Sequence, residues 1–388
     1  MSPKDQHVGL KEFREQLVHH ELIHDGDTIG TDDETLLRFL RARNFSLKQT
    51  LIMWKNCQEW RHTVEGRGID ELYREIDPFD YPERDIVFES WPLYFHKLDK
   101  EGHPINLHHF GGIDLSKLEG KMSLEHFWQT VLVNCEALPR EVLPAATQAA
   151  GKPILGTCVV VDLSGFGVSQ FWQMKDFARR SFQVSQDYFP ETVARLAIVN
   201  APRGFATIWN VMKPWIAKET AQKVTIMGAD YQHKLLEIID PESLPAYLGG
   251  QCICDGPGGC MKSSAGPWMY NRRRRRDLWL DGARTTPALL PGEHDQEELG
   301  AEALGGALPP PQAGPTLSAG SGSSSDDTSS VETSSPATPP PCIEGNKAAD
   351  LAKLELAVQY VYDAHPEARQ VHNGGDLHHD ASVHVIAH

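Results

Sequence analysis

The sequence has little of what marks secreted, membrane-spanning or nucleic-acid-binding proteins. Its N-terminal segment MSPKDQHVGLKEFREQ has no apolar core of the kind found in signal peptides, and no run of about 18 apolar residues occurs anywhere. We therefore expect neither a secretion signal nor a membrane span. The formal net charge of −16 disfavours general nucleic-acid binding. Seven cysteines without a secretion signal are typical of reduced thiols in a cytosolic protein.

The sequence also lacks the short motifs of common catalytic sites. No GxSxG, P-loop or Rossmann glycine motif occurs at a strand-to-helix turn, and DLSGFG lacks the glycine before Ser164 that a nucleophile elbow needs. HELIH at 20–24 has the form of a zinc-binding HExxH motif, but Asp25-Gly26-Asp27 ends the expected helix at 9–24 directly after it. We predict a protein that is not an enzyme and that holds no metal and no cofactor. A zinc enzyme built on HELIH is the alternative, and the zinc content of the purified protein tests it.

What is present is enough apolar material for a core and a separate acidic tail. Hydrophobic residues make up 40% of the chain, with 14 Phe, 9 Trp and 9 Tyr. From residue 283 onward there are 15 acidic and 4 basic residues, and 283–347 is rich in Pro, Gly and Ser. We expect 283–388 to be a disordered acidic tail, with a possible helix at 348–365.

Hydrophobic periodicity predicts two structured parts before the tail. A capping box at Thr31–Glu34 and an amphipathic pattern at 46–62 predict a helical domain over 1–75. Alternation at 93–110 predicts a β-hairpin, and 153–165 is the most strand-like run in the chain. Strand patterns then alternate with helical ones, including a long helix at 168–188, which indicates an α/β domain over 80–255 with a largely parallel sheet. We expect a basic and aromatic linker at 256–282.

The stretch from 196 to 228 has an unusual load of large apolar side chains. Two strand-like runs, LAIVN and KVTIMG, enclose a segment in which apolar residues recur at helical spacing. The residues on this apolar face, extended beyond Pro214, are Phe205, Ile208, Trp209, Met212 and Trp215. Either this helix is deeply buried, or it covers something apolar that is not protein.

Two further patterns have open interpretations. Cys252, Cys254 and Cys260 could form a metal knuckle, but no fourth ligand stands at zinc-finger spacing, so free thiols in a loop are the favoured interpretation. The arginine run 272–276 is usually a solvated face. Its aromatic and aliphatic flanks also suit contact with an anionic membrane surface, and a nuclear-targeting signal is the rival interpretation.

Nine segments in order between residues 30 and 260 resemble the CRAL-TRIO lipid-binding family, and within it the fungal secretory-pathway phosphatidylinositol/phosphatidylcholine transfer proteins. They are TLLRFLRARNF, NCQEWR, YFHKLDKEGHPI, VVVDLSG, SQDYFPE, IVNAPRGF, KPWI, KVTIMG and LPAYLGG. The resemblance implies a helical N-terminal tripod packed on an α/β domain whose mostly parallel sheet floors a pocket for one phospholipid. It also implies a mobile gate helix at about 204–216.

The resemblance assigns phosphatidylinositol headgroup binding to four positions. They are Arg43, Glu191, Thr220 and Lys223, and all four keep the residue type of the family. The chemistry agrees, since an inositol phosphate needs cations for its phosphate and acceptors for its hydroxyls. The alternative is that Glu191 and Lys223 only form a structural ion pair.

The positions that bind phosphatidylcholine in the family depart from its pattern here. Two tyrosines and a Ser-x-Thr pair correspond to Phe95, Asn106, Thr157 and Val159, of which Thr157 alone keeps a hydroxyl. Losing a hydrogen bond to a charged phosphate costs roughly 1.5–3 kcal/mol, or about tenfold in affinity. Phosphatidylcholine exchange is therefore doubtful, and the second ligand is left open.

These inferences predict a monomeric, cytoplasmic phospholipid transporter. It would bind phosphatidylinositol and transfer or present it between cytosolic membrane faces, as a peripheral protein in transient contact with anionic Golgi or endosomal membranes during vesicle-mediated transport. The alternative is a sensor or scaffold that binds another small hydrophobic ligand, such as a sterol-like molecule.

Overall fold

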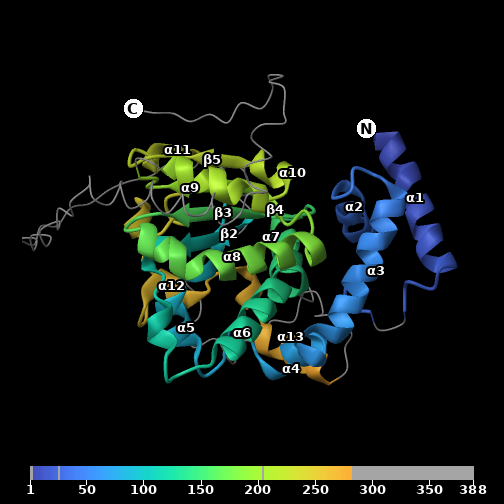
Figure 1. Cartoon of the computed structure of the whole chain (residues 1–388), viewed down its shortest axis with the longest axis horizontal. Helices are drawn as coiled ribbons and strands as arrows, with labels where there is room; N and C mark the ends of the chain where they lie inside the picture. Colours follow the sequence, from blue (N-terminus) through green and yellow to red (C-terminus); the bar gives the residue numbers. More distant parts are fainter. Residues whose placement is uncertain (1–2, 25–26, 203–204, 282–388) are drawn as a thin grey trace, which may run out of the picture.

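The structure is a computed structural model and describes residues 3–24, 27–202 and 205–281 (Figure 1). A β-sheet lies at the centre, α8 runs across one of its faces, and the first three helices form a separate group at one side (Figure 1). The acidic tail predicted at 283–388, with its possible helix at 348–365, lies outside the described residues.

The described residues form one five-stranded sheet in the order β1 (Leu93–Leu98), β2 (Pro104–His109), β3 (Thr157–Asp162), β4 (Val193–Val199) and β5 (Val224–Ile226). The first two strands are the predicted antiparallel hairpin, and each later strand pairs in parallel with the one before it. Every residue of β3 is buried, which explains its β-branched TCVVVD sequence, since strands of parallel sheets are covered on both faces. The predicted α/β class with a mostly parallel sheet is confirmed.

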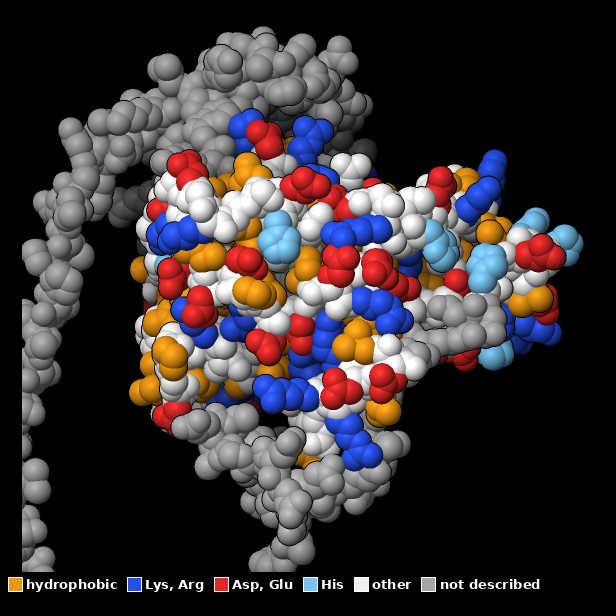
Figure 2. Space-filling view, turned by 90° about the horizontal axis from the view of Figure 1, so that it is seen from below, with side chains coloured by type: hydrophobic (Ala, Val, Ile, Leu, Met, Phe, Trp, Pro, Cys, Tyr) orange, Lys and Arg blue, Asp and Glu red, His pale blue; other side chains and the backbone are white. Residues whose placement is uncertain are grey.

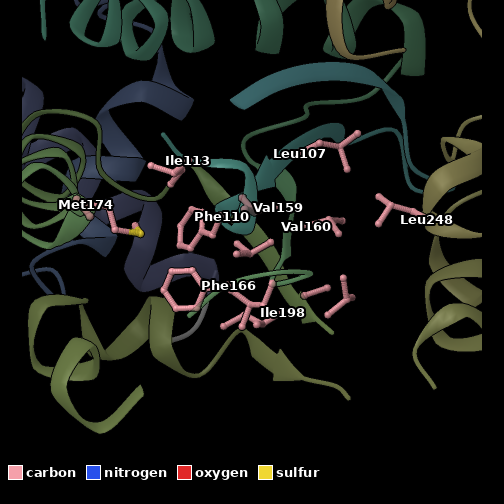
Figure 3. Close-up of a cluster of buried hydrophobic side chains, with 14 of the residues drawn as sticks. Leu107, Phe110, Ile113, Val159, Val160, Phe166, Met174, Ile198 and Leu248 are labelled. Atoms are coloured by element: carbon pink, nitrogen blue, oxygen red, sulfur yellow. The ribbon is translucent and has the colours of Figure 1, made fainter. Parts of the chain in front are cut away.

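The two faces of the sheet carry different residues because side chains alternate along a strand. Asn106 pairs with Phe95 on one side and with Val159 on the other, so these three share a face. The same face carries His108, Thr157, Val161, Leu196 and Ile198. The opposite face carries Tyr94, His96, Leu107 and Val160; Figure 3 shows Leu107 and Val160 on the side of Leu248, away from Phe110 and Phe166.

Helices before and between the strands complete the fold. The α-helices are α1 (Pro3–His19), α2 (Asp33–Arg41), α3 (Leu47–Thr63), α4 (Ile69–Glu75), α5 (Arg84–Ser90), α6 (Leu124–Ala137), α7 (Leu143–Ala150), α8 (Val168–Tyr188), α9 (Phe205–Met212), α10 (Lys218–Ala221), α11 (Gln232–Ile238), α12 (Gly259–Ser263) and α13 (Arg272–Leu280). Shorter helical turns are η1 (Val64–Gly66), η2 (Phe110–Gly112), η3 (Leu115–Leu118), the π-helix η4 (Leu138–Val142), η5 (Lys213–Trp215), η6 (Ala246–Leu248) and η7 (Pro267–Met269).

The N-terminal helices pack around their own aromatic core and contact the sheet domain through α3. The rings of Phe13 and Phe39 pack edge-on against Trp54, with centroids 5.9 and 4.9 Å away. On α3, Trp60 stacks on Tyr188 at the end of α8, with ring centroids 4.3 Å apart. The N-terminal helices therefore lie next to the chain that leads into β4.

Two details at the starts and ends of helices correct the sequence analysis. The predicted helix at 9–24 ends at His19, and Glu21 has a left-handed φ of 53°, so His20 and His24 do not share a helical face. The HELIH zinc interpretation is therefore wrong. The N-cap of α2 is Asp32 rather than Thr31, since the Asp32 carboxylate accepts the backbone N–H of Thr35 at 3.0 Å.

Three of the five arginines at 272–276 are held by internal contacts, whereas Arg273 and Arg274 are exposed, so the solvated interpretation is wrong for part of the run and membrane contact and nuclear targeting stay predictions. Arg272 and Arg275 are buried, and Arg272 lies 2.8 Å from Glu141 and hydrogen-bonds both oxygens of Asp77. Arg276 contacts Asp77 at 3.2 Å. On the face in Figure 2, basic and acidic side chains are interspersed, and histidines gather on the N-terminal helices.

Candidate functional site

A cavity of about 470 Å³ lies between one face of the sheet and the helices that cover it. Its floor is the sheet face that carries Asn106, and its walls come mainly from α6, α8 and the segment after β4. Apolar side chains dominate the wall, among them Trp91, Phe127, Phe182 and Ile198. A mostly apolar cavity with a few polar groups is the usual form of a small-ligand site.

The predicted gate helix covers this cavity, as two short helices rather than one. Phe205, Trp209 and Met212 of α9 line the cavity and are buried, while Ile208 is buried in the adjoining core. Trp215, in η5, is half-buried and does not line the cavity, but its carbonyl accepts a 2.7 Å hydrogen bond from the Gln186 amide of α8. Three of the five residues of the apolar face predicted from spacing thus line the cavity.

Three of the four predicted headgroup residues line the cavity. They are Arg43, just after α2, Glu191, just before β4, and Thr220, in α10. Glu191 has a left-handed φ of 58°, which is uncommon for a non-glycine residue and is often found at functional sites. The Arg43 guanidinium donates to the carbonyl of Ala42 at 2.9 Å.

The fourth predicted residue, Lys223, is not among the residues that line the cavity, but it contacts one of them. Its ammonium lies 3.2 Å from the Glu191 carboxylate and donates to the carbonyl of Val193 at 2.7 Å. The ion pair between these two residues, which the sequence left as an alternative, is therefore present. It does not exclude ligand binding, because the Glu191 carboxylate has a second oxygen and itself lines the cavity.

All four predicted second-ligand positions lie on the cavity floor or wall. Phe95 and Val159 offer it no hydrogen bond, and the Thr157 hydroxyl already donates to the carbonyl of Thr192 at 3.0 Å. The Asn106 side-chain oxygen is buried and, among the described residues, has no hydrogen-bond partner. Asn106 is thus the polar group on the floor that a ligand can reach.

Sequence reasoning missed a second polar group on the floor, His108. Its ring lines the cavity, its Nε2 has no partner among the described residues, and burial lowers the pKa of the imidazole to about 4. The signal was available, because His108 is two residues after Asn106 in a strand and so lies on the same face.

A further arginine, Arg38, contacts the chain next to Glu191. Arg38, on the buried side of α2, directs its guanidinium at the carbonyl of Pro190, with a separation of 3.5 Å between Nη1 and the oxygen. Pro190 directly precedes Glu191. The arginines of this segment therefore have different roles. Arg38 contacts the turn before Glu191, and Arg43 lines the cavity.

The arrangement suits an amphipathic ligand that stays chemically unchanged. Its apolar part can lie against the sheet floor, and its polar end can lie among the Arg43 cation, the Glu191 acceptor and the Thr220 hydroxyl. Within the described ranges, the structure contains no helix with the length and apolar character needed to cross a bilayer.

Comparisons with known proteins also point to a lipid-binding family. Residues 88–250 match the family model described as the CRAL/TRIO domain, and residues 9–56 match the CRAL/TRIO N-terminal domain. The chain is 39% identical over 243 residues to the Sec14 cytosolic factor of Schizosaccharomyces pombe, covering 63% of this chain and 82% of the relative. It is 34% identical over 269 residues to the SEC14 cytosolic factor of Kluyveromyces lactis, covering 68% and 84%. A phosphatidylinositol/phosphatidylcholine transfer protein of Arabidopsis thaliana, SFH9, is 34% identical over 269 residues, covering 68% of this chain and 44% of that relative.

Proposed function

The chain belongs to the CRAL/TRIO family, and we propose from this that it binds phosphatidylinositol in the cavity and transfers it between membranes. Relatives whose names describe phosphatidylinositol/phosphatidylcholine transfer support the ligand class. The observation that carries the proposal is the lining of the cavity, which is mostly apolar and includes the side chains of an arginine, a glutamate and a threonine.

In this proposal the headgroup lies beside Arg43, Glu191 and Thr220. Arg43 binds the phosphate, and the free oxygen of Glu191 and the Thr220 hydroxyl bind inositol hydroxyls. Lys223 keeps the Glu191 carboxylate charged and oriented through its 3.2 Å contact, and reaches the headgroup if that pair opens. The acyl chains lie along the sheet floor and beneath α9.

The covering segment is the proposed gate. In the described structure its apolar residues face inward, which suits a closed state. When α9 and η5 swing out, the same side chains, Trp209 and Met212 among them, become available to the bilayer surface. The protein would act as a monomer in transient contact with cytosolic faces of Golgi or endosomal membranes, and its relatives named cytosolic factors support the cytosolic side of this proposal.

A second ligand is favoured by one observation, the pair of unpartnered polar atoms on the floor. Asn106 Oδ1 accepts a hydrogen bond and His108 Nε2 can donate or accept one, so a ligand with a hydroxyl deep in the cavity satisfies them. Phosphatidylcholine gains nothing comparable from Phe95 and Val159. A small hydrophobic alcohol, such as a sterol-like molecule, is the candidate, and it is also the ligand of the alternative role as a sensor or scaffold.

Lipid transfer between vesicles tests the primary proposal. Labelled phosphatidylinositol is followed from donor to acceptor vesicles with the wild type and with Arg43→Ala, Thr220→Ala and Lys223→Ala. Each of the first two variants should lower transfer about tenfold, since each loses a hydrogen bond to a polar headgroup, and Lys223→Ala should abolish it. Lys218→Ala is the matched control, because its exposed side chain lies on the same short helix as Thr220.

Two measurements decide between the alternatives. If Lys223→Ala lowers thermal stability while Arg43→Ala and Thr220→Ala transfer phosphatidylinositol normally, these three residues do not bind the headgroup. The headgroup assignment is then wrong. Mass spectrometry of lipids that co-purify with the protein separates the two roles, because recovery of a hydrophobic alcohol without phosphatidylinositol supports the sensor.

A further inference from the structure

Four metal-ligating side chains meet on the sheet face opposite the cavity. They are His96, Cys252, Cys254 and Cys260, here called the Cys3His cluster, and their ligand atoms all lie within 4.8 Å of one another. Among the described residues this is the one group of three or more such side chains gathered in this way. We propose that the Cys3His cluster binds one zinc ion, which closes the segment after the sheet onto β1.

Two separations between the ligand atoms fit a tetrahedral zinc site. With Zn–S of about 2.3 Å and Zn–N of about 2.0–2.1 Å, a tetrahedron puts its sulfurs about 3.8 Å apart and its nitrogen about 3.5 Å from each sulfur. The Cys252 and Cys254 sulfurs are 3.8 Å apart, and His96 Nε2 lies 3.4 Å from the Cys252 sulfur. These two separations therefore match those between ligands of one zinc ion, and all four ligand atoms lie within 4.8 Å of one another.

The fourth ligand explains why the sequence pattern was misleading. Three cysteines in QCICDGPGGC lack a partner at zinc-finger spacing, and His96 supplies it from β1, 156 residues before Cys252. The expected loop thiols are in fact enclosed, with Cys252 at 6% and Cys260 at 9% exposure and His96 fully buried. Four protein ligands without an open position are typical of a structural rather than a catalytic zinc site.

The surroundings hold the histidine in the orientation that a metal requires. Ser263 Oγ lies 3.4 Å from His96 Nδ1, which leaves Nε2 directed at the sulfurs. The Ser263 hydroxyl also donates to the carbonyl of Cys260 at 3.0 Å, so the ligands and their support are tied together. A hydrogen bond to the second ring nitrogen is usual for zinc-bound histidines.

The backbone of the loop brings the cysteines together. Cys252 is joined to the chain before it, because its N–H donates to the carbonyl of Leu244 at 3.0 Å and it forms a β-bridge with Pro245. Gly256 and Gly258 then adopt left-handed φ values of 93° and 89°, which turn the chain back to Cys260. Glycine is favoured at such angles, and the Gly-Pro-Gly sequence at 256–258 supplies it.

A disulfide and simple apolar packing both fit the cluster less well than a metal does. A disulfide needs sulfurs about 2.05 Å apart, and the 3.8 Å between the Cys252 and Cys254 sulfurs is far longer. Packing of the cysteines as small apolar side chains does not account for a histidine nitrogen aimed at them. Cys57, Cys135 and Cys158 are also free cysteines, but none of them belongs to a group of metal-ligating side chains.

The metal content of the purified full-length chain tests the proposal. The protein is prepared under reducing conditions without chelator, and we expect about one zinc ion per chain by elemental analysis. A mercurial thiol reagent should release about one equivalent of zinc to a chromogenic indicator. Zinc well below one equivalent that added Zn²⁺ does not raise, or iron in its place, overturns the assignment.

Variants locate the ion. Cys254→Ser and His96→Ala should each lose most of the zinc, and Cys135→Ser, a matched substitution in α6, should retain it. If the two site variants do not fold, replacement of zinc by Co²⁺ in the wild type gives the decision. Intense visible bands and thiolate-to-cobalt charge transfer then indicate a tetrahedral thiolate site, and their absence contradicts it. The proposal is independent of lipid binding, because the cluster and the cavity lie on opposite faces of the sheet.

Discussion

Single residues on the cavity floor govern what the cavity can hold. Asn106 and His108 are two residues apart in β2, share the floor, and have polar atoms without partners among the described residues. Phe95 and Val159, their neighbours across the sheet, offer no hydrogen bond. The chemistry of the floor therefore selects for a ligand with a polar group near β2.

His108 gives a prediction about acid stability. Burial holds the pKa of its folded-state imidazole at about 4, below the unfolded value of about 6.5. The contribution of the neutral His108 ring to the unfolding free energy is therefore fully present above pH 6.5, and it is lost as the pH falls toward 4. Relative to His108→Gln, the wild type should lose about 2 kcal/mol of unfolding free energy between pH 7 and pH 5. Urea unfolding at both pH values measures this, and parallel losses in the two proteins would contradict it.

Some residue-level features could be predicted from the sequence and others could not. Arg43, Glu191 and Thr220 were placed by resemblance and do line the cavity. His96 could not be paired with the cysteines, since no local spacing relates residues so distant in sequence. The N-cap of α2 was misassigned by one residue because Thr31 and Asp32 are both good caps, and only geometry decides between them.

Among the secondary-structure elements, the segment between β4 and β5 differs most from its prediction. The spacing of apolar residues correctly indicated which face is buried, but α9 ends at Met212 and the chain continues as η5. Proline explains the break, because Pro214 lacks a backbone N–H and disfavours helical geometry in the residue before it. By contrast, α8 has the predicted bounds, and β3 was recognised from a sequence, TCVVVD, in which four of six residues are β-branched, as suits a strand buried on both faces.

The tether between α8 and η5 gives a prediction about the gate. Gln186 donates to the carbonyl of Trp215 at 2.7 Å, and its loss should favour the open state by about 1 kcal/mol. We expect Gln186→Ala to raise the rate of lipid release several-fold, measured by dequenching of a fluorescent phosphatidylinositol. Gln183→Ala, an exposed position on the same helix, is the control and should leave the rate unchanged. Equal rates in all three proteins would show that the tether does not hold the gate.

At the scale of the whole molecule, a buried ionic network joins the N-terminal helices to the lipid-binding part. Glu136 on α6 accepts hydrogen bonds from Arg61 on α3, at 2.7 and 2.9 Å, and from Arg140 in the π-helix. Arg140 also reaches Asp70 on α4. The π-helix in LPREVLP turns Arg140 inward, and its irregular backbone could not be read from sequence periodicity.

Removal of the Glu136 carboxylate should therefore strongly lower the stability of the fold. Glu136→Gln removes the carboxylate that two buried guanidinium groups share and leaves Asp70 as their remaining counter-ion, and we expect a loss of about 3–5 kcal/mol in unfolding free energy. Glu75→Gln, which removes a half-exposed pair with Arg67, should cost less than about 1 kcal/mol. Denaturant unfolding at pH 7 measures both, and similar losses for the two would contradict the distinction.

The loss of unfolding free energy in Glu136→Gln should depend on pH. Burial favours the neutral form of Glu136, but Arg61 and Arg140 outweigh it and hold its pKa below the usual value. The stability that this carboxylate contributes is therefore complete above the unfolded pKa of about 4.3 and is lost as the pH falls below it. The deficit of Glu136→Gln should shrink in that range.

The neighbouring positions Phe95 and His96 constrain β1 against insertions and deletions. Phe95 faces the cavity and His96 faces the cysteines, because consecutive side chains of a strand point to opposite faces. A one-residue insertion or deletion early in β1 would shift the pairing with β2 and exchange the two faces, which puts an imidazole into the cavity and a benzyl group among the thiols. Length variation in homologous chains should therefore fall in the turn at 99–103 and stay out of β1.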